Sequence, residues 1–207
     1  GDHLLYWQFG CNIFLYQADL LGMPGKATSP SIMTYGMMER LSDYARMLGR
    51  REDAEWLIET SSEIKAAVMS SLWNSDEGCT NNHIDLQDIP HMAHYYTDHI
   101  FSTLYASYDP MINWQCLNYL RKSLIEINFE GKPSLMRVGN LQGSLFGNDN
   151  VMPTQMAETA RAFYKIGDKK QATSFLESVA RAGTIYTDAP GNFPERMSDI
   201  GKGESNY

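Results

Sequence analysis

The sequence predicts an all-α protein, a helical hairpin array, and two features of the chain predict it. The first is a helical spacing of apolar residues. Between residues 31 and 48 the apolar side chains recur at steps of three and four and form one stripe: Met33, Met37, Leu41, Tyr44 and Leu48. The second is a glycine directly after such a stripe. Gly49 stands where a helix commonly ends with a residue in the left-handed conformation.

A second helix is expected over residues 52–73, because its apolar residues keep the helical spacing up to the turn-forming run at 74–78. Only a very short turn separates it from the first helix. The two helices should therefore form an antiparallel hairpin.

Two more hairpins are expected further along the chain. Pro90 and Pro153 stand where helices can start, since proline is tolerated in the first helical turn. Pro110 prevents a helix from continuing into it, which separates two helices. The expected helices are residues 90–107 with 111–127, and residues 153–166 with 169–186.

A short motif occurs twice in this pattern. Gly49 and Ala54 are matched by Gly167 and Ala172, each pair enclosing a charged turn between two helices. The distance between the copies is too large for a tight tandem repeat. We expect one helical domain over residues 1–207, which is either an incomplete array that belongs to a larger protein or a reduced helical domain.

Long loops connect the expected hairpins. Residues 74–89 and 128–152 are rich in Gly, Asn, Asp and Pro, and the second stretch alternates enough to allow a short strand. Residues 187–207 have no helical stripe and are expected to be an irregular loop segment. Long structured loops are where functional sites usually lie.

Composition excludes several classes of protein. The 207 residues carry a net charge of −8 without a Lys/Arg run, which argues against nucleic acid and anionic membranes as partners. No apolar run is long enough for a membrane span. No motif for a cofactor is present, and no signal segment separates a periplasmic or secreted protein from a cytoplasmic one. The oligomeric state is not indicated.

The loops hold the candidate catalytic carboxylates. Asp85 and Asp88 precede the helix expected from residue 90, where Asp88 also fits an N-cap. Glu195 lies beside Phe193, which would raise its pKa by desolvation, and Arg196, which would lower it. The alternative for Glu195 is a solvated ion pair with Arg196. Asp199 and Glu204 follow closely and compete with Glu195, and nothing in the sequence alone separates the three.

Two further groups of residues are candidates with a competing structural explanation. His91, His94 and Asp98 would share one face of a helix and could hold a metal ion, or they could simply hydrogen-bond along a polar face. No strict metal motif is present, and we predict no metal site. Trp7 is a candidate for stacking on a sugar, although a tryptophan at helical spacing is more often part of a core.

Three segments resemble the six-hairpin glycosidase superfamily, the (α/α)6 toroids. Residues 36–76 are similar to its recurring unit of helix, Leu-Gly, charged turn, helix and Leu-Trp. Residues 155–183 resemble a later hairpin, and residues 191–195 resemble the acidic loop that follows it.

The resemblance implies part of an (α/α)6 toroid, most plainly the C-terminal part, with a carbohydrate cleft at one end of the helices. It implies glycoside hydrolysis with Glu195 as the base that activates water. Asp85 or Asp88 is then the nearest match for the acid, and Trp7, Phe193 and Arg196 are candidate substrate contacts. The alternative function is a non-catalytic helical-repeat module that binds a protein or a glycan.

Overall fold

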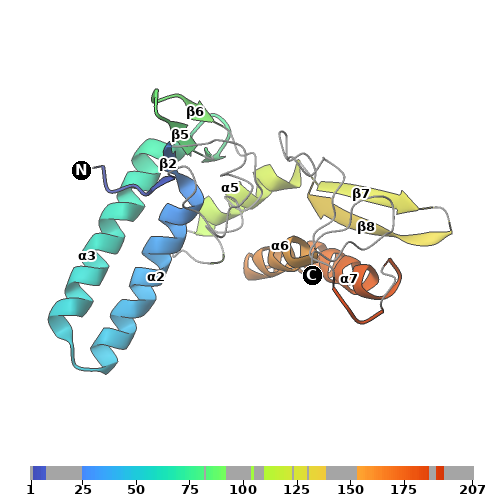
Figure 1. Ribbon diagram of the computed structural model, residues 1–207. Coiled ribbons are helices and arrows are strands. Elements are labelled where there is room, and N and C mark those ends of the chain that lie inside the picture. Colours follow the sequence, from blue (N-terminus) through green and yellow to red (C-terminus); the bar gives the residue numbers. More distant parts are fainter. Residues whose placement is uncertain are drawn as a thin grey trace. The chain divides into compact units, whose positions relative to one another are not determined.

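The computed structural model contains two compact units, Gly1–Cys116 and Leu117–Tyr207, each of which is described by itself (Figure 1). The described residues are 2–7, 25–81, 83–91, 104, 110–122, 124–129, 131–138, 153–186 and 190–193.

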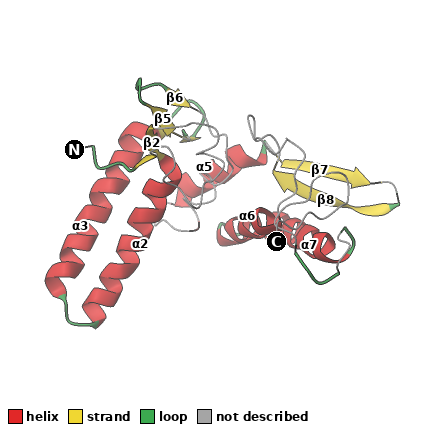
Figure 2. Ribbon diagram, in the orientation of Figure 1, coloured by secondary structure: helices red, strands yellow, loops and turns green. Residues whose placement is uncertain are grey.

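Both units combine helices with antiparallel strands (Figure 2). The helices are α2 (Thr28–Met47), α3 (Arg51–Ala67), the π-helical turn η1 (Val68–Leu72), α5 (Pro110–Arg121), α6 (Pro153–Lys165) and α7 (Lys169–Thr184). The strands are β1 (Tyr6–Trp7), β2 (Gly25–Ala27), β3 (Trp73–Asn74), β4 (Cys79–Thr80), β5 (His83–Asp85), β6 (Pro90–His91), β7 (Leu124–Phe129) and β8 (Lys132–Val138). The fold is therefore broadly helical, and the prediction that it contains helices alone is wrong.

Helices α2 and α3 form the first expected hairpin. Gly49 takes a φ of +74°, the left-handed conformation that ends a helix, and its N–H donates to the carbonyl of Arg46 at 3.0 Å. The N–H of Arg50 then donates to the carbonyl of Ala45 at 2.9 Å, which satisfies another carbonyl of the last helical turn.

Small residues pack the two helices of this hairpin together. Ser42 donates to the carbonyl of Ala54 at 3.0 Å, and Ser61 donates to the carbonyl of Tyr35 at 3.1 Å. Both serines are buried. Their short side chains let the backbones approach closely enough for these bonds.

The apolar stripe that predicts α2 is therefore not the face that packs against α3. Four of its side chains are exposed: Met37, Leu41, Tyr44 and Leu48. The apolar core of the first unit lies at the end of the hairpin away from its turn. It is a cluster of Leu4, Ile32, Tyr35, Ile64, Val68 and Leu72.

The first unit also contains a four-stranded antiparallel sheet, in which the strands lie in the order β1-β2-β5-β6. Gly25 of β2 pairs with Asp85 of β5, and a Cβ at Gly25 would lie 2.9 Å from the Cα of Asp85. Only glycine fits this close approach of two strands.

The segment around Pro90 differs from the prediction. Residues 83–91 form a β-hairpin, so Pro90 lies in an edge strand, where its missing N–H costs no hydrogen bond, and does not start a helix. Asp88 has a φ of +59° in the hairpin turn and is not an N-cap. The rest of the helix expected over 90–107 lies outside the described residues, apart from Leu104.

The second unit contains the α6–α7 hairpin, as predicted. Gly167 takes a φ of +85°, and the N–H of Asp168 donates to the carbonyl of Phe163 at 3.0 Å. These contacts repeat those of Gly49 and Arg50. The repeated motif therefore marks the same helix ending in both hairpins.

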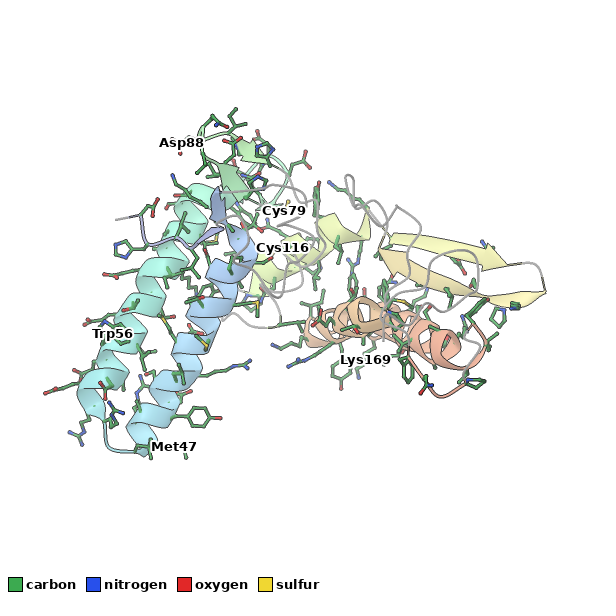
Figure 3. The ribbon with its side chains drawn as sticks, in the orientation of Figure 1. Met47, Trp56, Cys79, Asp88, Cys116 and Lys169 are labelled. Atoms are coloured by element: carbon green, nitrogen blue, oxygen red, sulfur yellow. The ribbon has the colours of Figure 1, made fainter. Side chains whose placement is uncertain are left out.

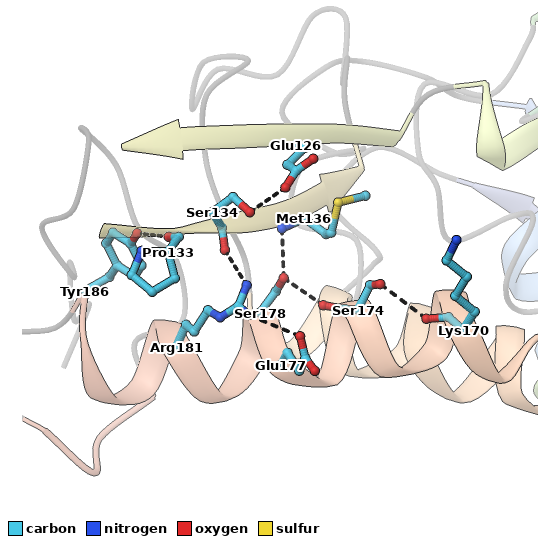
Figure 4. Close-up of polar contacts among 10 residues, drawn as sticks. All are labelled: Glu126, Pro133, Ser134, Met136, Lys170, Ser174, Glu177, Ser178, Arg181 and Tyr186. Atoms are coloured by element: carbon cyan, nitrogen blue, oxygen red, sulfur yellow. Dashed lines mark hydrogen bonds and ion pairs between the residues drawn. The ribbon is translucent and has the colours of Figure 1, made fainter. Parts of the chain in front are cut away.

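Strands β7 and β8 form a hairpin that lies along α7 (Figure 4). Three residues in the second half of α7 and just beyond it satisfy main-chain groups of β8: Ser178 Oγ accepts from Met136 N at 2.8 Å, Arg181 donates to Ser134 O at 2.8 Å, and the hydroxyl of Tyr186 donates to Pro133 O. This confirms the short strand allowed in residues 128–152. It also shows that residues 124–127, predicted as helix, are a strand.

Candidate functional site

Asp85 organises the turn between β5 and β6. Its Oδ1 accepts the N–H groups of Gln87 and Ile89, each at 2.9 Å. The turn is closed further by the main chain, since Asp85 N donates to Ile89 O at 3.0 Å. An aspartate side chain that bonds its own turn in this way is a common structural device.

The second oxygen of Asp85 faces a histidine. His91 Nε2 lies 2.8 Å from Asp85 Oδ2, and the His91 ring stacks on the His83 ring with 4.5 Å between centroids and 4° between planes. The hydrogen bond from His91 is the main cause that lowers the pKa of Asp85, and the backbone N–H of Ile89 adds to it. Asp85 is therefore held as a carboxylate, which suits a base or a nucleophile and opposes the role of proton donor.

Asp88 lies in the same turn and is largely solvated, with 79% of its side chain exposed (Figure 3). Its Oδ1 lies 3.1 Å from Lys26 Nζ, which is also 3.7 Å from Asp2 Oδ2. Asp88 keeps an accessible carboxyl group at the edge of the sheet.

Phe193 lies in the second unit, in the described part of the acidic loop. Its ring covers the backbone of α7 at Gly183, where a Cβ would lie 2.7 Å from Phe193 Cζ. The ring is nevertheless 58% exposed, so it has a free surface for a ligand.

The structure brings Asp85 and Asp88 into one turn of the first unit, and it describes Phe193 in the second unit. Glu195 and Arg196 lie outside the described residues. Trp7 belongs to β1 by its backbone, and its side chain is outside the described part.

The metal alternative also extends beyond the described part, which includes His91 but neither His94 nor Asp98. Among the described residues, no group of three His, Cys, Asp or Glu could hold a metal ion.

The contacts of Asp85 with His91 and of Asp88 with Lys26 both follow from the strand pairing in the first unit. The sequence analysis missed them because it expected a helix from residue 90. His91 lies within hydrogen-bonding distance of Asp85 because the pairing of β5 with β6 places His91 opposite His83. Lys26 reaches Asp88 from β2, which pairs with β5. The alternation of His83, Ile84 and Asp85 before a turn was the available sequence signal.

Glu158 in α6 is a second carboxyl group whose pKa is shifted. Burial raises its pKa, and the nearby charge of Arg161 opposes the shift. Sequence reasoning gave no indication of this residue, because its desolvation depends on how the second unit packs.

None of the described helices is long and apolar enough to cross a membrane.

Comparison with known proteins gives a structural likeness without a sequence family. No family model matches the chain, and no curated protein matches it. Among solved structures, the GH78 family rhamnosidase of Bacillus sp. GL1 matches with a TM-score of 0.61 and 13% sequence identity. The match covers 87% of this chain and 16% of the rhamnosidase chain. The chain therefore shares the fold of a small part of a glycosidase.

Proposed function

We propose that the protein hydrolyses glycosidic bonds with a pair of carboxyl groups. The observation that carries the proposal is the fold likeness to a rhamnosidase over 87% of the chain. The helical hairpins and their acidic loops support it, because they agree with the resemblance to (α/α)6 glycosidases.

The roles of the carboxyl groups follow from what each can do with a proton. Glu195 is the base that activates water. Asp85 is a poor acid because its hydrogen bonds hold it ionised. Asp88 has an accessible carboxyl group and is the remaining candidate to protonate the leaving oxygen, a role in which its ion pair with Lys26 would have to open.

The remaining candidates bind the substrate in this proposal. Phe193 offers an exposed ring, and Trp7 and Arg196 are assigned as further sugar contacts. Water would attack from the face opposite the acid. The separation of the two carboxyl groups would decide the stereochemistry, because about 6.5–9.5 Å suits inversion and about 5–5.5 Å suits retention.

The test is a kinetic comparison on a panel of alkyl and aryl glycosides, rhamnosides included. Replacing Glu195 by Gln removes the base, so we expect kcat to fall by about 10²–10⁴-fold on every substrate. Replacing Asp88 by Asn removes the acid. Its effect should be large on alkyl glycosides and small on aryl glycosides whose leaving group needs no proton.

The matched control is Asp76→Asn, which changes an exposed acid in a neighbouring turn and should leave kcat unchanged. A kcat for Glu195→Gln equal to that of the wild type would contradict the proposal. Equal losses on both substrate types in Asp88→Asn would remove Asp88 as the acid.

A second candidate function has its own observation. The exposed stripe of Met37, Leu41, Tyr44 and Leu48 on α2 is an apolar face of the kind that binds a partner. A non-catalytic helical module would use such a face. Binding that Leu41→Glu abolishes, in a protein that cleaves no glycoside, would favour this function.

A further inference from the structure

The imidazole ring of His91 is held in one orientation by two contacts. Its Nε2 lies 2.8 Å from Asp85 Oδ2, and its ring stacks on that of His83 with 4° between the planes. The carboxyl group of Asp85 is itself fixed, because its other oxygen accepts the N–H groups of Gln87 and Ile89. The ring is therefore preorganised before any ligand arrives.

The partner of Nε2 decides which nitrogen of His91 carries the proton. The hydrogen bond from His91 is the main cause that lowers the pKa of Asp85, and an ionised carboxyl group can only accept. Neutral His91 must then carry its proton on Nε2 and present a lone pair on Nδ1. Among the residues that the structure describes, no group forms a hydrogen bond with this Nδ1.

The strand register places His91 on a face of the β5–β6 hairpin that it shares with three other residues. His91 lies opposite His83, and the bond from Asp85 N to Ile89 O continues the same register. Exposure increases along this face, from 3% for His83 to 36% for the His91 side chain and 53% for Ile89. A fixed hydrogen-bond acceptor thus shares its face with an exposed apolar side chain.

This combination matches the chemistry of a sugar. A lone pair on Nδ1 accepts a hydrogen bond from a hydroxyl group, whereas a carboxylate or an ionised phosphate has no proton to donate. The C–H groups of a sugar ring can pack on an apolar side chain such as Ile89. Ligand sites in general combine a few well-placed polar groups with apolar surface.

We propose that His91 binds the sugar substrate by accepting a hydrogen bond from one of its hydroxyl groups through Nδ1. Asp85 and His83 are then positioning residues, which hold the ring and its tautomer. This inference rests on the proposed function and adds to it a residue that recognises the substrate. The contacts that carry it all lie within residues 83–91 of the first unit.

The first test is the tautomer of His91, read by nitrogen NMR of its ring at a pH of about 9, where an ordinary imidazole is neutral. The wild type should carry the proton on Nε2. In Asp85→Asn the amide oxygen can still accept the N–H groups of the turn, and the amide nitrogen then donates to Nε2. The proton should therefore move to Nδ1. A wild-type proton on Nδ1 would overturn the proposal.

The second test compares a cleaved glycoside with its monodeoxy analogues, each of which lacks one hydroxyl group. His91→Gln keeps an N–H donor for Asp85 and removes the acceptor at Nδ1. We expect its kcat/KM on the intact glycoside to fall about tenfold or more through a raised KM, with kcat within about threefold. On one deoxy analogue the variant and the wild type should be equal, because the recognised hydroxyl group is absent.

The matched control is His3→Gln. His3 also faces a carboxylate, since its Nδ1 lies 3.2 Å from Glu63 Oε2, but both side chains are about half exposed. This variant should leave every kinetic constant unchanged. Two results for His91→Gln would overturn the proposal: the same loss on the intact glycoside and on every analogue, which indicates a structural role, or no loss on any of them.

Direct binding separates this proposal from the proposed function. Rhamnose, glucose and galactose are each titrated into the wild-type protein, and the NMR signal of His91 Nδ1 is followed. We expect it to shift with at least one sugar, while the ring signals of His3 stay unchanged. A wild type that cleaves no glycoside contradicts the proposed function, and the titration still reports binding. No shift at His91 with any of the three sugars would overturn the inference.

Discussion

Asp85 illustrates how a residue that looks catalytic in the sequence can act mainly on its own turn. Both of its oxygens are used, one by the N–H groups of Gln87 and Ile89 and the other by His91. Its position in a loop before an expected helix suggested a catalytic carboxylate. The hydrogen bonds give it a structural role and hold it in the charged form.

This role predicts a pH dependence for Asp85→Asn. The folded state lowers the pKa of Asp85, so the charged form stabilises the protein above the ordinary pKa of 3.8. That stability is lost as the pH falls through the lowered value. Asp85→Asn should therefore lower the Tm at pH 7 and have a smaller effect at the lowest pH at which the protein stays folded, as measured by circular dichroism. An effect that grows on acidification would contradict this assignment.

Glu158 predicts the opposite sign. Burial raises its pKa above 4.5, so the folded state prefers the protonated form and loses stability as the pH rises through the raised value. Glu158→Gln should raise the Tm at pH 7 and change it little near pH 3.5. Glu55→Gln, at an exposed position of α3, serves as the control for a change of net charge. A lower Tm for Glu158→Gln at pH 7 would contradict this, because it would show that the charge of Glu158 stabilises the folded protein.

At the scale of elements, the two hairpins share one helix ending but differ at the next helix start. Asp168 caps α7 by accepting from Gln171 N at 3.0 Å, and it also forms an ion pair with Arg121. Arg50, the matching residue before α3, makes no capping bond with its side chain.

This difference gives a comparison within one chain. Asp168→Ala removes both the cap and the ion pair with Arg121, and loss of the cap alone should lower the free energy of unfolding by about 0.5–2 kcal/mol. Arg50→Ala removes only an exposed ion pair with Asp53 and should cost about 0–1 kcal/mol. Urea denaturation measures both. A loss from Arg50→Ala as large as that from Asp168→Ala would contradict the capping role.

The elements also differ in how well the sequence predicts them. Helices α2, α3, α6 and α7 were predictable because helical spacing and a left-handed glycine agree at each hairpin. Strand β7 carried a readable signal, since Ile125, Ile127 and Phe129 alternate with polar residues before a turn. The sequence analysis nevertheless expected a helix over residues 111–127, because the residues before β7 have helical spacing.

The β5–β6 hairpin could not be predicted in the same way. Its strands are two or three residues long, and its register depends on pairing with β2, which is far away in the sequence. The ion pair of Asp88 with Lys26 depends on the same pairing. Sequence spacing alone placed the two aspartates in one loop and left their partners unknown.

At the scale of the whole molecule, the account joins a broadly helical fold, a structural likeness to a rhamnosidase and a set of carboxyl groups on loops. Single-domain organisation over residues 1–207 stays a prediction, as do the roles of Glu195 and Arg196. The exposed apolar stripe on α2 has no role in the catalytic proposal.

The most direct test of the central claim is the rate of glycoside cleavage by the wild-type protein and by Glu195→Gln. Asp199→Asn, a neighbouring acid in the same segment, is the matched control. The account predicts that Glu195→Gln loses about 10²–10⁴-fold in kcat on a cleaved glycoside, while Asp199→Asn keeps the wild-type rate. Equal rates for the wild type and Glu195→Gln would contradict it.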